Sequence, residues 1–288
     1  MRVDLLAGTV YVPRAMTPRT PTILVFDSGL GGLTVLAELR RARPDARYLY
    51  AADDAGFPYG RFDEQALAAR LAAVMERLID RHAPDLVVVA CNTASTVEGV
   101  LPHLRARFPV PFVGTVPAVK PAALLSRSRR ISVLATPGTV ARAYTRDLVA
   151  TYAGDAKVTL VGSPRLAEIA TAELAGEAVS DAEVRAEIAP AFVADEVGRT
   201  DVVVLGCTHY PLLLPRFERV SPWPVVWLDP APAIARRVAD LLGPSIPGEH
   251  ETGDGVAVFT DGAGVTPALR ETLAARGLSR CEAEPLPL

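Results

Sequence analysis

The sequence of 288 residues contains very little lysine and histidine. Of its 30 basic residues only two are lysines, Lys120 and Lys157, so we expect no pyridoxal cofactor, whose Schiff base needs a suitably placed lysine. None of the four histidines belongs to a His-Glu-x-x-His pair, and no Cys-x-x-Cys motif accompanies them. A zinc site would therefore lack ligands. The sequence predicts neither an organic cofactor nor a metal.

Cysteine, net charge and long apolar runs are also scarce. Cys91, Cys207 and Cys281 are odd in number and widely spaced, which argues against a disulfide framework and for a reducing cytoplasm. The formal net charge of −3 gives no field that would attract nucleic acid or an anionic membrane. The longest apolar runs, 86–91 and 202–207, fall far short of the roughly 18 residues of a membrane-spanning helix. We expect a folded cytoplasmic protein.

Short β-branched runs alternate with longer stretches of helical period from residue 21 onward. Alternation of this kind is typical of βα units around a mainly parallel sheet. The run 86–90, apolar throughout, is typical of a strand buried on both faces. The fold class is therefore α/β. The predicted strands are 22–26, 47–50, 86–90, 131–134, 157–161, 202–205 and 256–260, and the predicted helices include 33–41, 63–82, 95–107, 231–242 and 267–276.

The two halves of the sequence resemble each other. The segment 85–91, an Asp, an apolar run and a Cys, aligns with 201–207, and 23–29 aligns with 131–138. Two matches in the same order predict two pseudo-symmetric lobes with a cleft between them. We assign residues 1–20 to an N-terminal extension, 21–115 to the first lobe, completed by 229–288, and 116–228 to the second lobe.

Both Cys91 and Cys207 stand where a predicted strand ends, which is where open α/β sheets bind ligands. A free cysteine is by itself most often a small core residue, but Asn92 and Thr93 follow the first thiol, and Thr208 follows the second. A helix start after each Cys would lower the pKa of its thiol. Two facing thiols fit acid–base chemistry better than a hydrolase, which needs one nucleophile. One thiolate would remove a proton from carbon while the other thiol protonates the opposite face, which is racemisation.

A glycine-rich turn follows the first strand. The segment 27–32, Asp-Ser-Gly-Leu-Gly-Gly, resembles a dinucleotide fingerprint, but Thr34 stands where the third glycine belongs. A tight turn explains the glycines equally well, and its N–H groups would suit a small carboxylate. Asp27, beside a thiol, would assist acid–base chemistry. By themselves, residues 57–60 could be an ordinary turn and His209 an ordinary polar residue near a strand end, and either could instead belong to a functional site.

Five motifs together resemble the glutamate racemases, of the cofactor-independent aspartate/glutamate racemase superfamily. The resemblance covers about residues 21–229 and implies two α/β lobes with the active site between them. It also implies cofactor-free interconversion of L- and D-glutamate, the D-form being a building block of bacterial peptidoglycan. The motifs are Asp27-Ser28-Gly29 with Gly31-Gly32, Pro58-Tyr59-Gly60, Cys91-Asn92-Thr93, Thr136-Pro137-Gly138-Thr139 and Gly206-Cys207-Thr208-His209-Tyr210-Pro211.

The resemblance also implies roles for individual residues. Cys91 would take the α-proton from D-glutamate and Cys207 from L-glutamate, with Asp27 supporting the first thiol and His209 the second. The residues expected to hold the substrate are Ser28, Tyr59, Gly60, Asn92, Thr93, Thr136, Thr139 and Thr208.

One position departs from the pattern. Thr171 stands where the family commonly has a Glu, with Glu168 three residues earlier, and Glu168 is left out of the predicted site. Asp53 lies where an acidic residue often precedes the Pro-Tyr-Gly motif, and Cys281 is expected to be non-catalytic.

Two alternatives stay open at the level of the sequence. A related two-cysteine racemase would act on aspartate or hydantoins. A non-catalytic protein would capture a dicarboxylate in the cleft and use both thiols only for packing. The sequence also leaves the oligomeric state open, a homodimer included.

Overall fold

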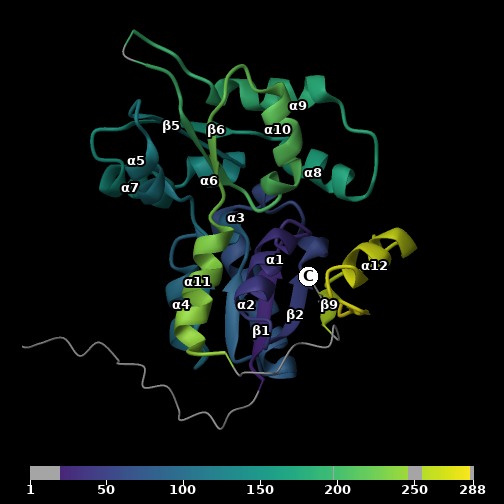
Figure 1. The fold of residues 1–288 in the computed structure, drawn as a ribbon. Coiled ribbons are helices and arrows are strands. Elements are labelled where there is room, and N and C mark those ends of the chain that lie inside the picture. The colour runs from purple at the N-terminus through teal and green to yellow at the C-terminus, as the bar shows by residue number, and fades with distance from the viewer. Residues whose placement is uncertain (1–19, 197, 246–254, 286–288) are drawn as a thin grey trace, which may run out of the picture.

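Two parallel β-sheets organise the computed structural model, which describes residues 20–196, 198–245 and 255–285 (Figure 1). Six strands form the first sheet in the order β10-β9-β2-β1-β3-β4, and four form the second in the order β6-β5-β7-β8. Every pairing between named strands is parallel, which confirms the predicted fold class. Apart from residue 20, the predicted N-terminal extension lies outside the described residues. The strands are β1 (Thr22–Asp27), β2 (Arg47–Ala52), β3 (Leu86–Val89), β4 (Phe112–Gly114), β5 (Arg130–Ala135), β6 (Lys157–Gly162), β7 (Val202–Gly206), β8 (Val226–Leu228), β9 (Val256–Phe259) and β10 (Arg280–Ala283).

The repeat seen in the sequence is a repeat of topology. The order β2-β1-β3-β4 in the first sheet matches β6-β5-β7-β8 in the second, so the aligned segments form the two central strands of each unit. The aligned aspartates, Asp85 and Asp201, also make equivalent hydrogen bonds to backbone amides. The Asp85 carboxylate accepts a hydrogen bond from the Thr22 amide at 2.8 Å, and the Asp201 carboxylate accepts from the Arg127 and Ser128 amides at 2.7 and 2.8 Å. Each aspartate thus fixes the loop that leads into the neighbouring central strand.

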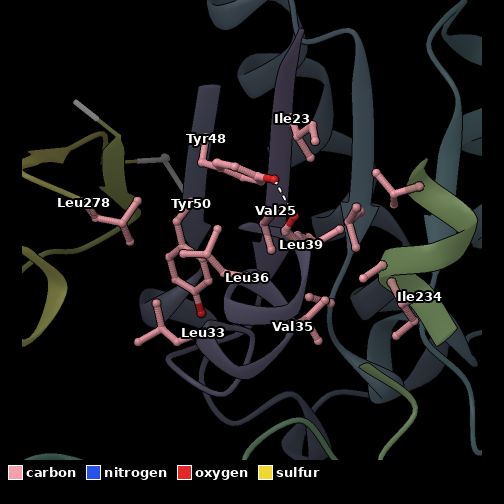
Figure 2. Close-up of a cluster of buried hydrophobic side chains, with 14 of the residues drawn as sticks. Ile23, Val25, Leu33, Val35, Leu36, Leu39, Tyr48, Tyr50, Ile234 and Leu278 are labelled. Carbon is pink, nitrogen blue, oxygen red and sulfur yellow. Dashed lines mark hydrogen bonds between the residues drawn. The ribbon is translucent and has the colours of Figure 1, made fainter. Parts of the chain in front are cut away.

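Helices cover both faces of the first sheet. Ile23 and Val25 of β1 pack with α1 and α11 in one apolar cluster (Figure 2). Leu24 and Phe26 face the other way and pack with α2 and α4, as the two-residue period of a strand requires. The helices here are α1 (Leu33–Ala42), α2 (Glu64–His82), α3 (Asn92–Ser95), α4 (Val100–Arg107), α11 (Ala231–Leu242) and α12 (Pro267–Ala274), with 3-10 turns η1 (Asp54–Gly56) and η2 (Tyr59–Arg61).

The second sheet is covered in the same manner. Leu134 and Leu205 pack with α8, α9 and α10, whereas Val133 and Val204 pack with α5 and α7. The elements are α5 (Val119–Leu125), α6 (Pro137–Ala141), α7 (Ala143–Tyr152), α8 (Leu166–Leu174), α9 (Asp181–Ile188) and α10 (Leu214–Val220), with 3-10 turns η3 (Ala189–Ala191) and η4 (Tyr210–Leu213).

The last part of the chain returns to the first sheet. Strand β9 pairs with β2 and β10 pairs with β9, and α11 packs against α1; Figure 1 shows β9, in yellow, beside β2. Cys281 lies in β10, which is an edge strand of the first sheet.

The helix predicted over 95–107 is wrong. The chain forms α3 and α4 with a break at 96–99, where Gly99 adopts a left-handed φ of +73° that starts α4. No helix in the described part of the chain combines the length and apolarity that crossing a membrane demands.

Candidate active site

A small cavity of about 30 Å³ lies between the carboxyl-terminal ends of the two sheets. Such a volume holds about two water molecules. Ten of the twelve predicted site residues line it: Ser28, Tyr59, Gly60, Cys91, Asn92, Thr93, Thr136, Cys207, Thr208 and His209. Asp27 and Thr139, both fully buried, lie behind this lining and bond to it.

Cys91 follows the end of β3 and is the N-cap residue of α3. Its side chain is 5% exposed, and its sulfur lies 3.6 Å from the Ser28 hydroxyl oxygen. Burial, with the negative charge of Asp27, raises the pKa of the Cys91 thiol to about 12, and the Ala94 and Ser28 backbone N–H groups offset only part of the rise. The predicted lowering of this pKa is wrong, because loss of solvent outweighs the helix N-terminus.

Cys207 occupies the equivalent position after β7 and is 8% exposed. The helix start expected after this Cys is the 3-10 helix η4, which a short turn separates from Cys207. Burial raises the pKa of the Cys207 thiol well above its ordinary value, despite the His209 and Tyr210 backbone N–H groups that favour the thiolate. Both thiols are therefore neutral at pH 7 in this closed state.

His209 connects the second thiol to the first lobe. Its Nε2 accepts a hydrogen bond from the Gly31 amide at 3.1 Å, and its Nδ1 lies 3.8 Å from the Cys207 sulfur. Burial lowers the pKa of the imidazole, so the ring is neutral at pH 7. Because Nε2 is an acceptor, the single ring proton resides on Nδ1 and faces the sulfur. The Phe57 ring covers His209, with centroids 5.6 Å apart.

Asp27 organises the glycine-rich turn before α1. Its Oδ2 accepts from the Gly29 and Gly32 amides at 3.3 and 3.0 Å, and its Oδ1 accepts from the Thr208 hydroxyl at 3.5 Å. The carboxylate thus holds the loop that carries Ser28 and also contacts the turn after Cys207.

Three threonine hydroxyls meet where the two lobes touch. Thr93 of α3 lies 3.1 Å from the Thr136 hydroxyl and 3.2 Å from the Thr139 hydroxyl, oxygen to oxygen, and the latter two are 3.1 Å apart. Beside them the Arg142 guanidinium donates to the Thr93 carbonyl at 2.9 Å. These contacts join α3 to the start of α6 and α7.

Asn92 has an unusual environment. Its side chain is 2% exposed, yet both its amide nitrogen and its amide oxygen are buried without a hydrogen-bond partner among the described residues. A buried amide without partners costs free energy. Since Asn92 lines the cavity, the amide is suited to a polar ligand that enters there.

Glu168 does not line the cavity. Its side chain is 55% exposed, with a carboxylate oxygen 3.8 Å from the Arg61 guanidinium. Thr171 bonds instead to the Ala167 carbonyl, at 3.0 Å. No group of three or more His, Cys, Asp or Glu side chains within the described ranges is placed to bind a metal ion.

Some contributors to the site were missed in the sequence. Phe57, Pro58 and Ala167 also line the cavity, and Gly31 reaches His209. Pro58 and Gly31 belong to quoted motifs and could have been assigned on that ground. Nothing local in the sequence distinguishes Ala167 from an ordinary helix residue.

Comparisons with known proteins agree with this geometry. The chain belongs to the Asp/Glu/Hydantoin racemase family, whose model matches residues 33–238. It is thus an amino-acid racemase, an isomerase. The resemblance noted in the sequence is confirmed by its relatives. A glutamate racemase from Agrobacterium fabrum is 54% identical over 241 residues, covering 83% of this chain and 88% of that protein. A glutamate racemase from Brucella canis is 53% identical over 256 residues, covering 88% and 91%.

Solved structures give the same result. Escherichia coli glutamate racemase, in complex with L-glutamate and the activator UDP-MurNAc-ala, is 39% identical with a TM-score of 0.85, covering 94% of this chain and 100% of that one. Thermus thermophilus glutamate racemase, in complex with β-chloro-D-alanine, is 28% identical with a TM-score of 0.71, covering 93% and 97%.

Proposed function

We propose that this enzyme interconverts L- and D-glutamate with two cysteine bases. The observation that carries the proposal is the placement of two buried thiols, from equivalent strands of the two lobes, on one small cavity. The names of the relatives and the L-glutamate bound to the E. coli enzyme support glutamate over aspartate or a hydantoin.

The reaction moves one proton at each face of the α-carbon. With D-glutamate, the Cys91 thiolate takes the α-proton, and the C–H electron pair passes into the α-carboxylate. The Cys207 thiol then gives its proton to the opposite face, leaving L-glutamate, a Cys91 thiol and a Cys207 thiolate. L-glutamate reacts through the same steps in reverse, so no redox cofactor is consumed.

The supporting residues act on the two sulfurs separately. The Nδ1–H of His209 is directed at the Cys207 sulfur and would donate to its thiolate. The Ser28 hydroxyl would donate to the Cys91 thiolate, in a loop that Asp27 holds in place. Hydrogen bonds to a charged sulfur favour the thiolate and so oppose the effect of burial.

The substrate itself brings a positive charge to the cavity. Its α-ammonium group would lower the pKa of a nearby thiol, because an opposite charge favours the thiolate. The α-proton is still far less acidic than a thiol, so charge developing on the α-carboxylate needs preorganised donors. We assign this work to the Asn92 amide, to the hydroxyls of Thr93, Thr136, Thr139 and Thr208, and to the backbone at Tyr59 and Gly60.

Substrate entry requires the lobes to separate, because a cavity of about 30 Å³ has room for little more than water. We propose that 21–115 with 229–288 moves against 116–228, and that closure excludes water from the reacting groups. The biological role we propose is supply of D-glutamate for peptidoglycan in the cytoplasm.

Isotope exchange tests the proposal. In heavy water, D-glutamate formed from L-glutamate should carry deuterium at the α-carbon, while L-glutamate recovered early should carry little, because separate thiols serve the two faces. Mass spectrometry of the separated enantiomers at early times provides the measurement. Largely protiated product, or equal labelling of both pools, would exclude two separate bases.

Turnover of aspartate or a hydantoin in preference to glutamate would reassign the substrate, and binding of glutamate without turnover would exclude catalysis.

A further inference from the structure

A buried carboxylate lies behind the Tyr59 side of the cavity. Asp53 directly follows β2 and is fully buried. Its carboxylate accepts four short hydrogen bonds: from Arg70 Nε and Nη2 at 2.6 Å each, from the Tyr59 hydroxyl at 2.6 Å and from the Thr260 hydroxyl at 2.7 Å. Arg70 and Thr260, 17 and 207 positions away in the sequence, therefore meet the nearby Tyr59 at one charge.

The charge of Asp53 is compensated within this group. The two hydrogen bonds from the Arg70 guanidinium form a bidentate pair, the strongest arrangement between an arginine and a carboxylate. They raise the pKa of Arg70. An uncompensated buried charge would be strongly destabilising. Asp53 and Arg70 therefore form a rigid ion pair, to which the loop that carries Tyr59 can bond.

Tyr59 connects this ion pair to the cavity. Burial and the negative charge of Asp53 raise the pKa of the Tyr59 hydroxyl well above its ordinary value. The phenol therefore stays protonated and donates a hydrogen bond to Asp53. A phenol has one O–H donor. Because that donor is engaged with Asp53, the hydroxyl acts as an anchor, and the backbone at Tyr59 and Gly60 is what faces the substrate.

The C-terminal segment clamps the same loop a second time. The Thr260 hydroxyl, which follows β9, accepts from the Ala55 amide at 3.1 Å while donating to Asp53. The neighbouring Asp54 carboxylate accepts from the Asp261 and Gly262 amides at 2.8 and 2.9 Å. Residues 53–60 are thereby tied to 260–262.

We infer that Asp53, Arg70 and Thr260 are positioning residues that act through the Tyr59 hydroxyl to fix the Tyr59–Gly60 backbone against the substrate. This inference rests on the proposed function for its kinetic consequence, but the ordering of the loop can be measured without turnover. Two other roles compete with it: direct binding of substrate by the Tyr59 hydroxyl, and a contribution of the network to stability alone.

Thr260→Val tests the inference because it removes the hydroxyl, keeps the side-chain shape and leaves the ion pair intact. We expect KM for glutamate to rise roughly two- to tenfold, the range for one net hydrogen bond, with kcat changed less than twofold. Thr260→Ser, which keeps the hydroxyl, should restore KM. Thr272→Val makes the same chemical change on α12, away from Asp53, and should leave both constants unchanged.

Hydrogen exchange supplies the second measurement. The Gly56, Phe57, Arg61 and Phe62 amides bond within the 53–62 segment, and we expect them to exchange faster in Thr260→Val than in Thr272→Val. Wild-type exchange in this segment together with wild-type KM would overturn the inference. A lowered melting temperature with unchanged kinetics and exchange would assign the network to stability alone, which also overturns it.

Tyr59→Phe separates anchoring from direct substrate binding. If both hydroxyls act through Asp53, the KM effects of Tyr59→Phe and Thr260→Val should not multiply in the double variant. A large effect of Tyr59→Phe beside no effect of Thr260→Val would mean that the phenol contacts substrate directly, contrary to the inference. A wild-type chain inactive on glutamate would refute the proposed function only, since the exchange measurement still decides whether Thr260 orders the loop.

Discussion

The backbone amide of Gly31 donates a hydrogen bond to Nε2 of His209, nitrogen to nitrogen 3.1 Å, across 178 positions of sequence. The contact joins the turn before α1 in the first lobe to the turn after β7 in the second. It decides which ring nitrogen holds the proton, and so directs an N–H at the Cys207 sulfur. The proton of a group in one lobe is therefore placed by the backbone of the other lobe.

Gly31→Ala should disrupt this arrangement. A Cβ at Gly31 would overlap the His209 ring, so the ring must move away from Cys207 or the lobes must close less fully. We expect kcat/KM to fall about a hundredfold, as displacements near 1 Å in an active site do. Steady-state racemisation followed by circular dichroism measures the loss. Gly264→Ala is the control, since its Cβ would meet nothing within 4 Å; equal activities of the two variants would contradict the role of this contact.

Replacing either active-site thiol by a hydroxyl should abolish most activity. A hydroxyl is a much weaker acid than a thiol, so Cys91→Ser and Cys207→Ser should each reduce racemisation by orders of magnitude. The two enantiomers have equal free energies, so kcat/KM must fall by the same factor in both directions for each variant. Cys281→Ser changes a thiol in β10, outside the cavity, and should keep full activity. Near-normal turnover by either active-site variant would disprove the two-base assignment.

Asn92→Ala should weaken glutamate binding without lowering the stability of the fold. Since the Asn92 amide has no partner among the described residues, its removal loses no internal hydrogen bond and relieves a buried polar group. We expect an unchanged or slightly raised melting temperature together with a KM raised roughly tenfold or more, the loss expected for hydrogen bonds to a charged carboxylate. Thermal unfolding and kinetics on the same preparation test both parts. A destabilised variant with normal KM would show that the amide serves the fold.

The Cys91 thiol should make the folded state sensitive to alkaline pH. Its pKa is raised from 9.0 to about 12, so between these values the unfolded chain releases a proton that the native state keeps. The free energy of unfolding then falls as pH rises, by up to about 1.4 kcal/mol per pH unit for this one group. Below pH 9 the thiol is protonated in both states and this loss of stability is absent.

Urea unfolding of wild type and Cys91→Ser between pH 8.5 and 10.5, with reductant present, measures that slope. The variant should lose stability less steeply than wild type. Cys281→Ser is the matched control, because partial burial raises the pKa of that thiol but Arg270 opposes the rise. Parallel curves for wild type and Cys91→Ser would show that the Cys91 thiol is not held neutral in the fold.

The sequence contained enough to predict the two-sheet fold and the residues that meet in the cavity. The two lobes and the two thiols follow from local patterns, namely apolar runs that end in Cys91 and Cys207 and a repeat of Asp85 at Asp201. Most of the other cavity residues were predicted from the resemblance of their motifs to those of the glutamate racemases. The break at 96–99 was not predicted, because the whole stretch was assigned to one helix although Thr96, Val97 and Gly99 are poor helix formers. The raised thiol pKa values were not predicted either, since they depend on how completely the closed lobes exclude water. Likewise, the sequence around Asp53 did not indicate that this carboxylate bonds to Arg70 and Thr260, which lie 17 and 207 positions away.

The return of the chain to its first sheet also sets an order of events during synthesis on the ribosome. Strand β9 pairs with β2, and Thr260 bonds to Asp53 across 207 positions. The second sheet is made wholly of residues 130–228 and can be complete while residues 256–283 are still to be added. The first sheet, although it begins earlier, must wait for its last two strands. A chain truncated before residue 255 would have both cysteines and most of the substrate contacts, but no clamp for the loop that completes the cavity.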